Sequence, residues 1–317
     1  MPWYKGNLHC HSTNSDGHSS PAEVAACYRA MGMDFVTVSD HNRLTAVEEY
    51  SAALGPDCAG IPCCEYTGNR SAHVVAVDVD RAVAPAPELA QASVAEILQD
   101  GIVQTASAGG VAVLCHPCWN WAFDHETILG LDGVTHFEVF NASPDCNSYP
   151  VGGPSAPEQI WDRVLSAGVR MYGIAADDAH RHGSACDGGR PLNHLALGGR
   201  GWVVVKAAEL SRGAIRRAFE AGHFYASTGV ELATYRVTRE AITIGVSLWS
   251  HEQVAAEFIG ADGEVLSRVA GTDATYRFTG SETYVRARIA DTGGCFAFTQ
   301  PVFLDAIDEA VEWTADE

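Results

Sequence analysis

Positive charge is scarce in this sequence. Its 317 residues include 20 Lys and Arg against 40 Asp and Glu, which gives a formal net charge of −20. Such a surface repels the phosphates of a nucleic acid, so we expect no polymeric nucleic-acid partner. A small phosphorylated ligand would be repelled as well, unless bound cations reversed the charge locally.

Long apolar runs and nucleotide-binding loops are also missing. No apolar stretch approaches the roughly 20 residues that cross a membrane, and none precedes the first polar motif. We therefore expect a soluble, cytoplasmic protein with no signal peptide and no membrane partner. The sequence has neither a Gly-x-Gly-x-x-Gly nor a Walker loop, which argues against dinucleotide and nucleoside triphosphate cofactors.

The ten cysteines lack the spacing of a disulfide scaffold or a zinc ribbon. Several lie inside apolar runs, which favours reduced thiols in a core. The run Cys115-His116-Pro117-Cys118 imitates a thioredoxin motif, but its Trp follows the second Cys instead of preceding the first. We therefore interpret His116, and not the two cysteines, as the functional residue of this run.

Short apolar stretches alternate with helical ones up to about residue 230. The predicted strands, with their polar ends, cover residues 8–11, 35–41, 63–67, 73–77, 111–117, 136–141 and 171–180, and the predicted helices cover 21–32, 93–109, 157–168 and 207–222. Strands of this kind imply a parallel α/β sheet, and their number suggests a closed barrel over residues 1–230. Alternating stretches with Gly-rich turns then predict a β-rich C-terminal appendage, 231–317, to which we assign no catalytic part.

Histidines and acidic residues gather where the predicted strands end. His9 and His11 are two apart on a short strand, so their imidazoles point the same way. Asp16 follows in a Ser-Asp-Gly turn that can bring its carboxylate back toward them. Later strands end in His41, His116, Asp178 and His180. Parallel barrels carry their chemistry at these ends, so we expect the side chains to meet; His73 breaks the pattern because it opens its strand.

This ordered set resembles the PHP (polymerase and histidinol phosphatase) family of metallohydrolases. The matching motifs, in chain order, are His9-x-His11 with Ser15-Asp16-Gly17, Ser39-Asp40-His41, Glu65, His73, His116-Pro117 and Asp178-x-His180. Short strings at 224–229, 284–286 and 299–301 resemble the carbaryl-hydrolase-like (CehA/McbA) branch. The resemblance implies a distorted, TIM-like (β/α)7 barrel that holds two or three divalent cations, Mn, Zn or Fe.

The resemblance also implies which residues bind the cations. The first metal would be held by His9, His11, Glu65 and Asp178. Glu65 would bridge to a second metal held by His73 and His116, and a third would be held by Asp16, His41 and His180. Glu65, Asp178 and His180 are expected to act directly in catalysis, and Asp40 is expected to orient His41 or its neighbours. Mixed imidazole and carboxylate ligands independently suit these metals.

The implied reaction is hydrolysis of a small, phosphorylated molecule by a hydroxide that bridges two cations. Two alternatives stay open: the same site could hydrolyse a carbamate, ester or amide, or the chain could be a non-catalytic metal-binding module. Trp119 and Trp121, which follow the His-Pro motif, favour an aromatic or apolar substrate portion.

Other polar residues have candidate roles for which a structural explanation is equally available. Possible phosphate ligands are Arg181, Arg190 and Lys206, possible proton donors are His18, Asp177 and His182, and possible substrate contacts are Glu138 and Asn141. Because the candidate ligands all precede residue 231, we expect truncation after Gly229 to cost stability more than chemistry.

Overall fold

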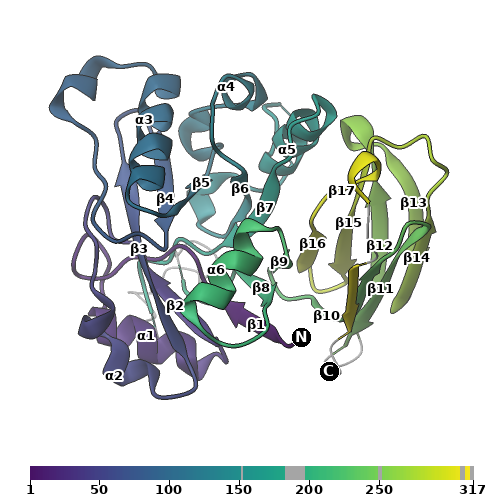
Figure 1. The fold of residues 1–317 in the computed structure, drawn as a ribbon, viewed down its shortest axis with the longest axis horizontal. Coiled ribbons are helices and arrows are strands. Elements are labelled where there is room, and N and C mark those ends of the chain that lie inside the picture. The colour runs from purple at the N-terminus through teal and green to yellow at the C-terminus, as the bar shows by residue number, and fades with distance from the viewer. Residues whose placement is uncertain (151–152, 183–196, 249–251, 308–310, 315–317) are drawn as a thin grey trace.

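The computed structural model describes residues 1–150, 153–182, 197–248, 252–307 and 311–314. Most strands belong to one large sheet of order β13-β12-β15-β16-β9-β8-β1-β2-β3-β4-β5-β6-β7, and four more form a sheet of order β14-β11-β10-β18. In Figure 1 the strands coloured green to yellow, which follow residue 231, form a layered group at the right of the view.

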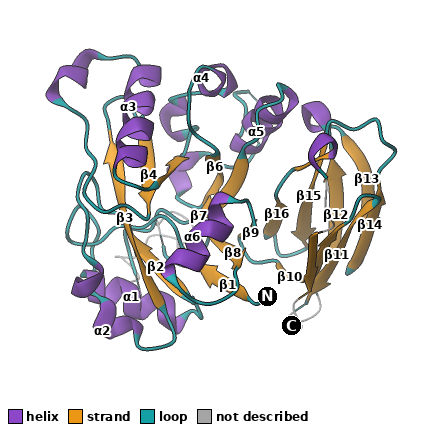
Figure 2. Ribbon diagram, viewed as in Figure 1, coloured by secondary structure: helices purple, strands orange, loops and turns teal. Residues whose placement is uncertain are grey.

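Up to residue 230 the chain alternates strands with helices. Its strands are β1 (Trp3–Gly6), β2 (Phe35–Val38), β3 (Ala59–Thr67), β4 (His73–Val77), β5 (Val111–Leu114), β6 (His136–Asn141), β7 (Tyr172–Ala176), β8 (Trp202–Lys206) and β9 (Phe224–Ser227). Its helices are α1 (Pro21–Ala30), α2 (Ser51–Leu54), α3 (Val94–Ser107), α4 (His125–Leu129), α5 (Pro157–Ser166) and α6 (Arg212–Glu220). Figure 2 shows helices α1–α5 around the outside of strands β2–β7. The predicted mixed α/β fold is confirmed.

Helices α1 and α3 begin at capping boxes that the sequence displays. Ser20 Oγ accepts a hydrogen bond from the Glu23 amide, and the Glu23 carboxylate accepts one from the Ser20 amide. Ser93 and Glu96 make the same reciprocal pair at α3. These bonds satisfy amides that a helix N-terminus leaves unpaired. Within the described ranges, none of the helices has the length and hydropathy that crossing a membrane requires.

The large sheet is mixed, whereas the sequence suggested a parallel one. Strands β1, β2 and β3 run parallel, as do β5, β6 and β7, but β4 is antiparallel to β3 and to β5. The parallel prediction is wrong for β4 because residues 68–72, which join it to β3, are too few for a crossover and form a hairpin. Strand β8 is likewise antiparallel to β1 and β9.

An isolated β-bridge connects the segment that follows β7 to the segment that follows β1. Cys10 pairs with Ala179 in parallel register, and the Ala179 carbonyl accepts a hydrogen bond from the His11 amide at 2.8 Å. Within the described residues no strand ladder joins β7 to β1 or to β8, so a closed (β/α)7 barrel is not confirmed. The bridge nevertheless places residues 9–11 beside residues 178–180.

An apolar cluster fills the space between these strands. Its members include Leu8, Phe35, Ile61, Val75, Val113, Ile174 and Val203, all nearly or fully buried. The cysteines in the described part of the chain are free thiols, and Cys10, Cys63, Cys64, Cys115, Cys118 and Cys146 are buried. The expectation of reduced thiols in a core therefore holds for them, while Cys186 lies outside the described residues.

After residue 231 the described elements are strands and short 3-10 turns. The strands are β10 (Glu231–Val237), β11 (Ala241–Ser247), β12 (Val254–Ile259), β13 (Val265–Ala270), β14 (Asp273–Arg277), β15 (Tyr284–Asp291), β16 (Phe296–Thr299), β17 (Val302–Phe303) and β18 (Val311–Thr314). Because β16 pairs with β9, part of this group continues the large sheet. The division of the chain between residues 230 and 231 stays a prediction.

Two buried polar side chains fasten the C-terminal strands to the rest. The Arg286 guanidinium, with no exposed surface, makes two 2.7 Å hydrogen bonds to Asp162 and stacks over Trp161 of α5. The Gln300 amide accepts from the Gly173 N–H and donates to the Gly173 carbonyl, each at 2.8 Å. Both side chains belong to the strings at 284–286 and 299–301, so these strings have a structural role.

The buried side chain of His136 should make the stability of the protein depend on pH. It is fully buried on β6, where its Nε2 donates to the Phe219 carbonyl at 3.0 Å and its ring stacks on Phe219. Burial lowers the pKa of His136 to about 4, against the smaller opposing effect of that hydrogen bond. Between pH 6.5 and 4 the unfolded chain therefore binds a proton that the folded chain does not, so stability falls as the pH falls.

The contribution of His136 can be isolated with His136→Gln, which cannot titrate. In EDTA, lowering the pH from 7.5 to 5.0 should cost the wild-type protein about 2 kcal/mol more of unfolding free energy than it costs the variant. Urea denaturation at the two pH values measures this difference. Equal losses in both proteins would show that His136 is not the group responsible.

Candidate metal centre

Residues at the ends of β1 and β7 meet through the Cys10–Ala179 bridge. His11 Nε2 lies 3.0 Å from Asp178 Oδ1, and His9 Nε2 lies 3.3 Å from the same oxygen. Both imidazoles are fully buried, and Asp178 is nearly so. The Asp178 backbone has a positive φ of 49°, and that of His116 is 26°. Strained backbone of this kind concentrates at functional sites.

The fully buried Glu65 lies at the middle of the arrangement. Its carboxylate oxygens lie within 3.5 Å of an imidazole nitrogen of each of His9, His11, His41, His73 and His116. The shortest of these distances, 2.7 Å and 2.8 Å, are to His41 and His73. One carboxylate thus contacts residues from all three of the expected ligand sets.

The position of His73 is explained by the direction of its strand. Because β4 runs antiparallel to β3, with His73 paired to Thr67, the beginning of β4 lies at the same edge as the end of β3. His73 Nδ1 donates to Glu65 Oε1 at 2.8 Å. The residue that broke the predicted pattern therefore lies beside the others.

Three further candidate ligands are more exposed to solvent: Asp16, His41 and His180. Asp16 Oδ1 is 3.5 Å from His41 Nε2, and Asp16 Oδ2 is 3.4 Å from His180 Nε2. Gly17 allows this turn to pack closely, because a Cβ there would lie 2.4 Å from the His11 carbonyl oxygen. The structure therefore brings together all nine predicted ligands, which we call the ligand cluster: His9, His11, Asp16, His41, Glu65, His73, His116, Asp178 and His180.

The ligand cluster fits divalent cations. Its possible ligand atoms fall into groups lying within 4.8 Å of one another: His11/Asp16/His41/His180, His9/His116/Asp178 and His41/Glu65/His73, with Cys115 also near His9 and Glu65. Among the described residues, the buried Glu65 Oε2 and His116 Nδ1 lack an aligned hydrogen bond. Converging imidazole and carboxylate atoms with unmet bonding capacity suit Zn, Mn or Fe.

The charges in the ligand cluster are strongly coupled. Burial lowers the pKa of His9, but the carboxylates of Asp178, Glu138 and Glu65 outweigh it and hold that pKa well above its usual value. Burial raises the pKa of Asp178, but His9 and His11 outweigh it and lower that pKa. The buried carboxylates thus require positive charge nearby, which protons supply when cations do not.

Two residues outside the ligand cluster support it through hydrogen bonds. Glu138, considered as either a substrate contact or a structural residue, accepts from His9 Nδ1 and from the His116 amide, each at 2.7 Å. Asp40, expected to orient His41 or its neighbours, accepts from Ser12, Ser15 and Thr45. Among the described hydrogen bonds none joins the Asp40 carboxylate to the His41 ring, so this carboxylate supports the loop that carries Asp16. The His41 ring has Thr67 Oγ1 at 2.6 Å from its Nδ1.

Asn141 links this support to the ligand cluster. Its amide donates to Glu138 at 2.9 Å and to Asp178 Oδ2 at 3.3 Å. From the sequence, Glu138 and Asn141 at the end of a strand were possible substrate contacts, with a structural role equally available. In the structure their side chains bond to each other and to ligand-cluster residues.

A cavity of about 290 Å³ opens onto the ligand cluster. Its lining includes every cluster residue except His9 and His11, together with Thr67, Trp119, Ser143, Asp145 and Cys146. Trp119 lies with its ring centroid 5.2 Å from those of His73 and His116, and its Nε1 donates to Asp145. Among the described lining residues there is no Arg or Lys.

The remaining candidates lie outside this lining. Asp177 is fully buried and accepts from Tyr28 Oη at 2.8 Å, and burial raises its pKa to about 7. Burial lowers the pKa of His182 to about 4. Lys206 pairs with Trp3 at the opposite end of β1. His18 is exposed, Arg181 is not among the lining residues, and Arg190 lies outside the described residues.

Comparison with known protein sequences finds a similarity to only a short part of this chain. No protein-family model matches the chain. A 5'-3' exoribonuclease of Haemophilus influenzae is 31% identical over 81 residues, which are 24% of this chain and 30% of that protein. The chain therefore spans less than a third of the length of this curated relative.

Comparison with solved structures finds similarities with low sequence identity and TM-scores below 0.5. A two-domain protein from Bacteroides vulgatus, containing a predicted PHP-like metal-dependent phosphoesterase, is 15% identical with a TM-score of 0.49, over 98% of this chain and 94% of that one. A protein from Bifidobacterium adolescentis described as a metal-dependent phosphoesterase is 16% identical with a TM-score of 0.43, over 59% and 91%. An amidohydrolase from Chromobacterium violaceum is 17% identical with a TM-score of 0.40, over 60% and 93%.

Proposed function

We propose that this chain is a divalent-metal-dependent hydrolase of small molecules and that its substrates are phosphate esters. The observation that carries the proposal is the convergence of imidazoles on the buried Glu65 carboxylate, at the floor of a cavity. Divalent cations held there would supply Lewis acidity that activates a water nucleophile and offsets negative charge on the attacked group.

The hydrogen bonds around the ligand cluster orient the imidazoles for this task. Glu138 holds the proton of His9 on Nδ1, which leaves Nε2 directed at Asp178 and Glu65. The Asp178 carbonyl accepts from His180 Nδ1 at 2.9 Å, so that Nε2 of this ring faces Asp16. Fixing one nitrogen through a hydrogen bond sets the tautomer and presents the other nitrogen as a ligand.

Charge favours a phosphate ester as substrate. The carboxylates of the ligand cluster are Asp16, Glu65 and Asp178. Glu138 behind His9 and Asp145 in the lining add two more negative charges. Two divalent cations would outweigh the three carboxylates of the ligand cluster, and three would outweigh all five, although the protein as a whole carries −20. In a cavity whose described lining has no Arg or Lys, the cations are then the groups that attract a phosphate.

A second candidate function is hydrolysis of an aryl carbamate, ester or amide by the same centre. The observation that favours it is Trp119, whose ring forms an aromatic wall against His73 and His116. A neutral substrate with an aromatic group needs less positive charge than a phosphate ester does.

A substrate panel under metal control distinguishes these functions. Protein stripped with EDTA should release no phosphate from 4-nitrophenyl phosphate or bis(4-nitrophenyl) phosphate. Reloading with Mn or Zn should restore turnover by at least about 100-fold, since cations contribute several kcal/mol to such reactions. Turnover of 1-naphthyl N-methylcarbamate without release from any phosphate ester would favour the second candidate. Metal binding without any turnover would support a non-catalytic module.

RNA belongs in the same panel because the matched relative is an exoribonuclease. We expect a 5'-phosphorylated oligoribonucleotide to remain intact, since a formal net charge of −20 opposes binding of a polyanion. Gel analysis of the metal-loaded protein with the RNA tests this expectation, and stepwise shortening of the RNA would contradict it.

A further inference from the structure

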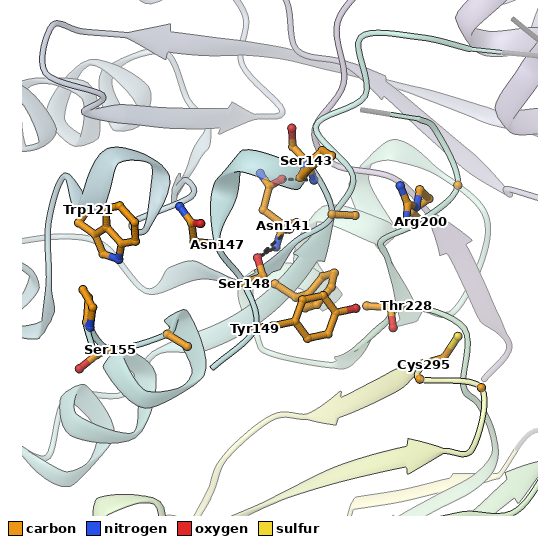
Figure 3. Close-up of a pocket in the computed structure, with 18 residues that line it drawn as sticks. Trp121, Asn141, Ser143, Asn147, Ser148, Tyr149, Ser155, Arg200, Thr228 and Cys295 are labelled. Carbon is orange, nitrogen blue, oxygen red and sulfur yellow. Dashed lines mark hydrogen bonds between the residues drawn. The ribbon is translucent and has the colours of Figure 1, made fainter. Parts of the chain in front are cut away.

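A second cavity, of about 710 Å³, shares the lining residue Ser143 with the cavity at the ligand cluster. Figure 3 shows the residues that line this second cavity. We call it the side groove. In Figure 3 Trp121 and Asn147 lie on the left of the view, Thr228 and Cys295 lie on the right, and Tyr149 lies between them. Its volume lies within the range of small-molecule sites, which is roughly 300–1,000 Å³. The groove is therefore large enough for an organic group bigger than the one that fits at the ligand cluster.

The side groove adjoins the cavity at the ligand cluster. Ser143 lines both cavities, at the start of the short 3-10 turn Pro144–Cys146. Asn141, which donates to Asp178, also lines the groove. In Figure 3 Ser143 and Asn141 lie at the upper edge of the groove, joined by a hydrogen bond. A molecule whose reacting end lies at the ligand cluster can thus extend past Ser143 into the groove.

The C-terminal strands build part of the groove wall. The turn between β15 and β16 contributes Gly293, Gly294 and Cys295. This turn is held in place because Thr228 Oγ1 accepts from the Phe296 amide at 2.8 Å. The cavity at the ligand cluster takes its described lining from residues before 181, so the C-terminal contribution is confined to the side groove.

The lining of the side groove is uncharged apart from one cation. Its described residues include Arg200 and no carboxylate, although acidic residues outnumber basic ones twofold in the chain. Its other polar side chains, among them Asn147, Ser148, Ser155 and Thr228, are neutral, and those of Asn147, Ser148 and Thr228 are hydrogen-bonded within the protein. A ligand that carries positive charge would find no carboxylate to pair with among the described lining residues.

The groove also holds the most exposed aromatic side chains. Among the aromatic residues whose side chains the structure describes, which leave out Trp313, the two exposed ones are Trp121 with 55% and Tyr149 with 54% exposure, and both line this cavity. Phe140 lies behind Tyr149 in an edge-on contact with a centroid distance of 5.3 Å. Exposed aromatic faces in a concave, neutral site favour planar aromatic ligands.

We propose that the side groove binds the leaving-group portion of the substrate, a neutral aromatic alcohol whose phosphate ester is attacked at the ligand cluster. The claim that a phosphate ester reacts at the ligand cluster rests on the proposed function. The claim that an aromatic group binds in the side groove rests on the lining of the groove. The C-terminal turn at 293–295 then contributes to substrate selection without contacting the reacting atoms.

The groove is tested first without catalysis. With EDTA present, 1-naphthol should bind the wild-type protein, as measured by ligand-observed NMR titration. Trp121→Ala and Tyr149→Ala should each weaken this binding at least tenfold. Leu129→Ala, which removes an exposed apolar side chain outside the groove, should leave it unchanged. Thermal melts show whether each variant is folded.

Kinetics then connect the groove to the reaction. With metal-loaded protein, Trp121→Ala and Tyr149→Ala should raise the KM for 1-naphthyl phosphate about tenfold and leave kcat/KM for methyl phosphate unchanged. Naphthol binding that the folded variants do not weaken would overturn the groove assignment, as would equal losses on both substrates. Naphthol binding that behaves as expected, without turnover of any phosphate ester, would instead refute the proposed function.

Discussion

Asp178→Asn should abolish turnover and remove at least one bound cation while the protein stays folded. The Asp178 carboxylate lies 3.0 Å from His11 and 3.3 Å from His9, and an amide at this position keeps the shape but loses the charge. Asn also tolerates the positive φ of 49° at this residue, so the backbone can stay as it is. We expect kcat to fall by at least about 100-fold, as losing a ligand exceeds the 10- to 100-fold cost of losing a supporting residue.

Elemental analysis and thermal melts accompany the kinetics of Asp178→Asn. The matched control is Asp80→Asn, which changes an exposed carboxylate that pairs only with the neighbouring Arg81 among the described contacts. The control should keep wild-type metal content and turnover. A folded Asp178→Asn protein with full metal content and full activity would contradict the assignment of Asp178 as a ligand, and so would a loss caused by unfolding.

Arg286→Met should lower the unfolding free energy by about 3–5 kcal/mol. The guanidinium is fully buried between Asp162 and Glu158, with nitrogen to oxygen distances of 2.7 Å and 2.9 Å. Removing it leaves the carboxylate of Asp162 buried without its cation, and an unpaired buried charge costs far more than an exposed one. Urea denaturation in EDTA measures the loss without a contribution from bound metal.

Two further variants show whether the unpaired charge is the cause. Arg286→Met combined with Asp162→Asn removes that charge and should recover part of the lost stability. Arg170→Met breaks an exposed pair with Asp305 and should cost under about 1 kcal/mol. If Arg286→Met cost no more than Arg170→Met, the buried pair would not be what holds α5 to β15.

The sequence was sufficient for features that depend on local pattern. Apolar runs ending in His41, His116 and Asp178 predicted strands with chemistry at one edge, and these residues do meet there. The helices predicted at 21–32 and 93–109 are present as α1 and α3, and their starts are set locally, since Ser20 and Ser93 bond to amides only three residues away. The proximity of the predicted ligands therefore followed from strand order and strand ends, whereas their binding of metal stays a prediction.

Features that depend on long-range pairing could not be predicted in this way. The direction of β4, which explains His73, is decided by the hairpin it forms with β3. The partner of Asp40 is decided by the loop that folds over it, and that of Glu138 by His9, 129 residues away in the chain. Likewise, the single Cys10–Ala179 bridge in place of a continuous ladder has no signature in either segment.

Anomalous X-ray diffraction from crystals of the protein loaded with Mn or Zn tests the central claim most directly. The account predicts at least two anomalous peaks, one among His9, Asp178 and Glu65 and another among Glu65, His73 and His116, each at about 2.0–2.3 Å from its ligand atoms. Crystals from metal-loaded protein with no anomalous density within bonding distance of Glu65, or with density only elsewhere on the molecule, would contradict it.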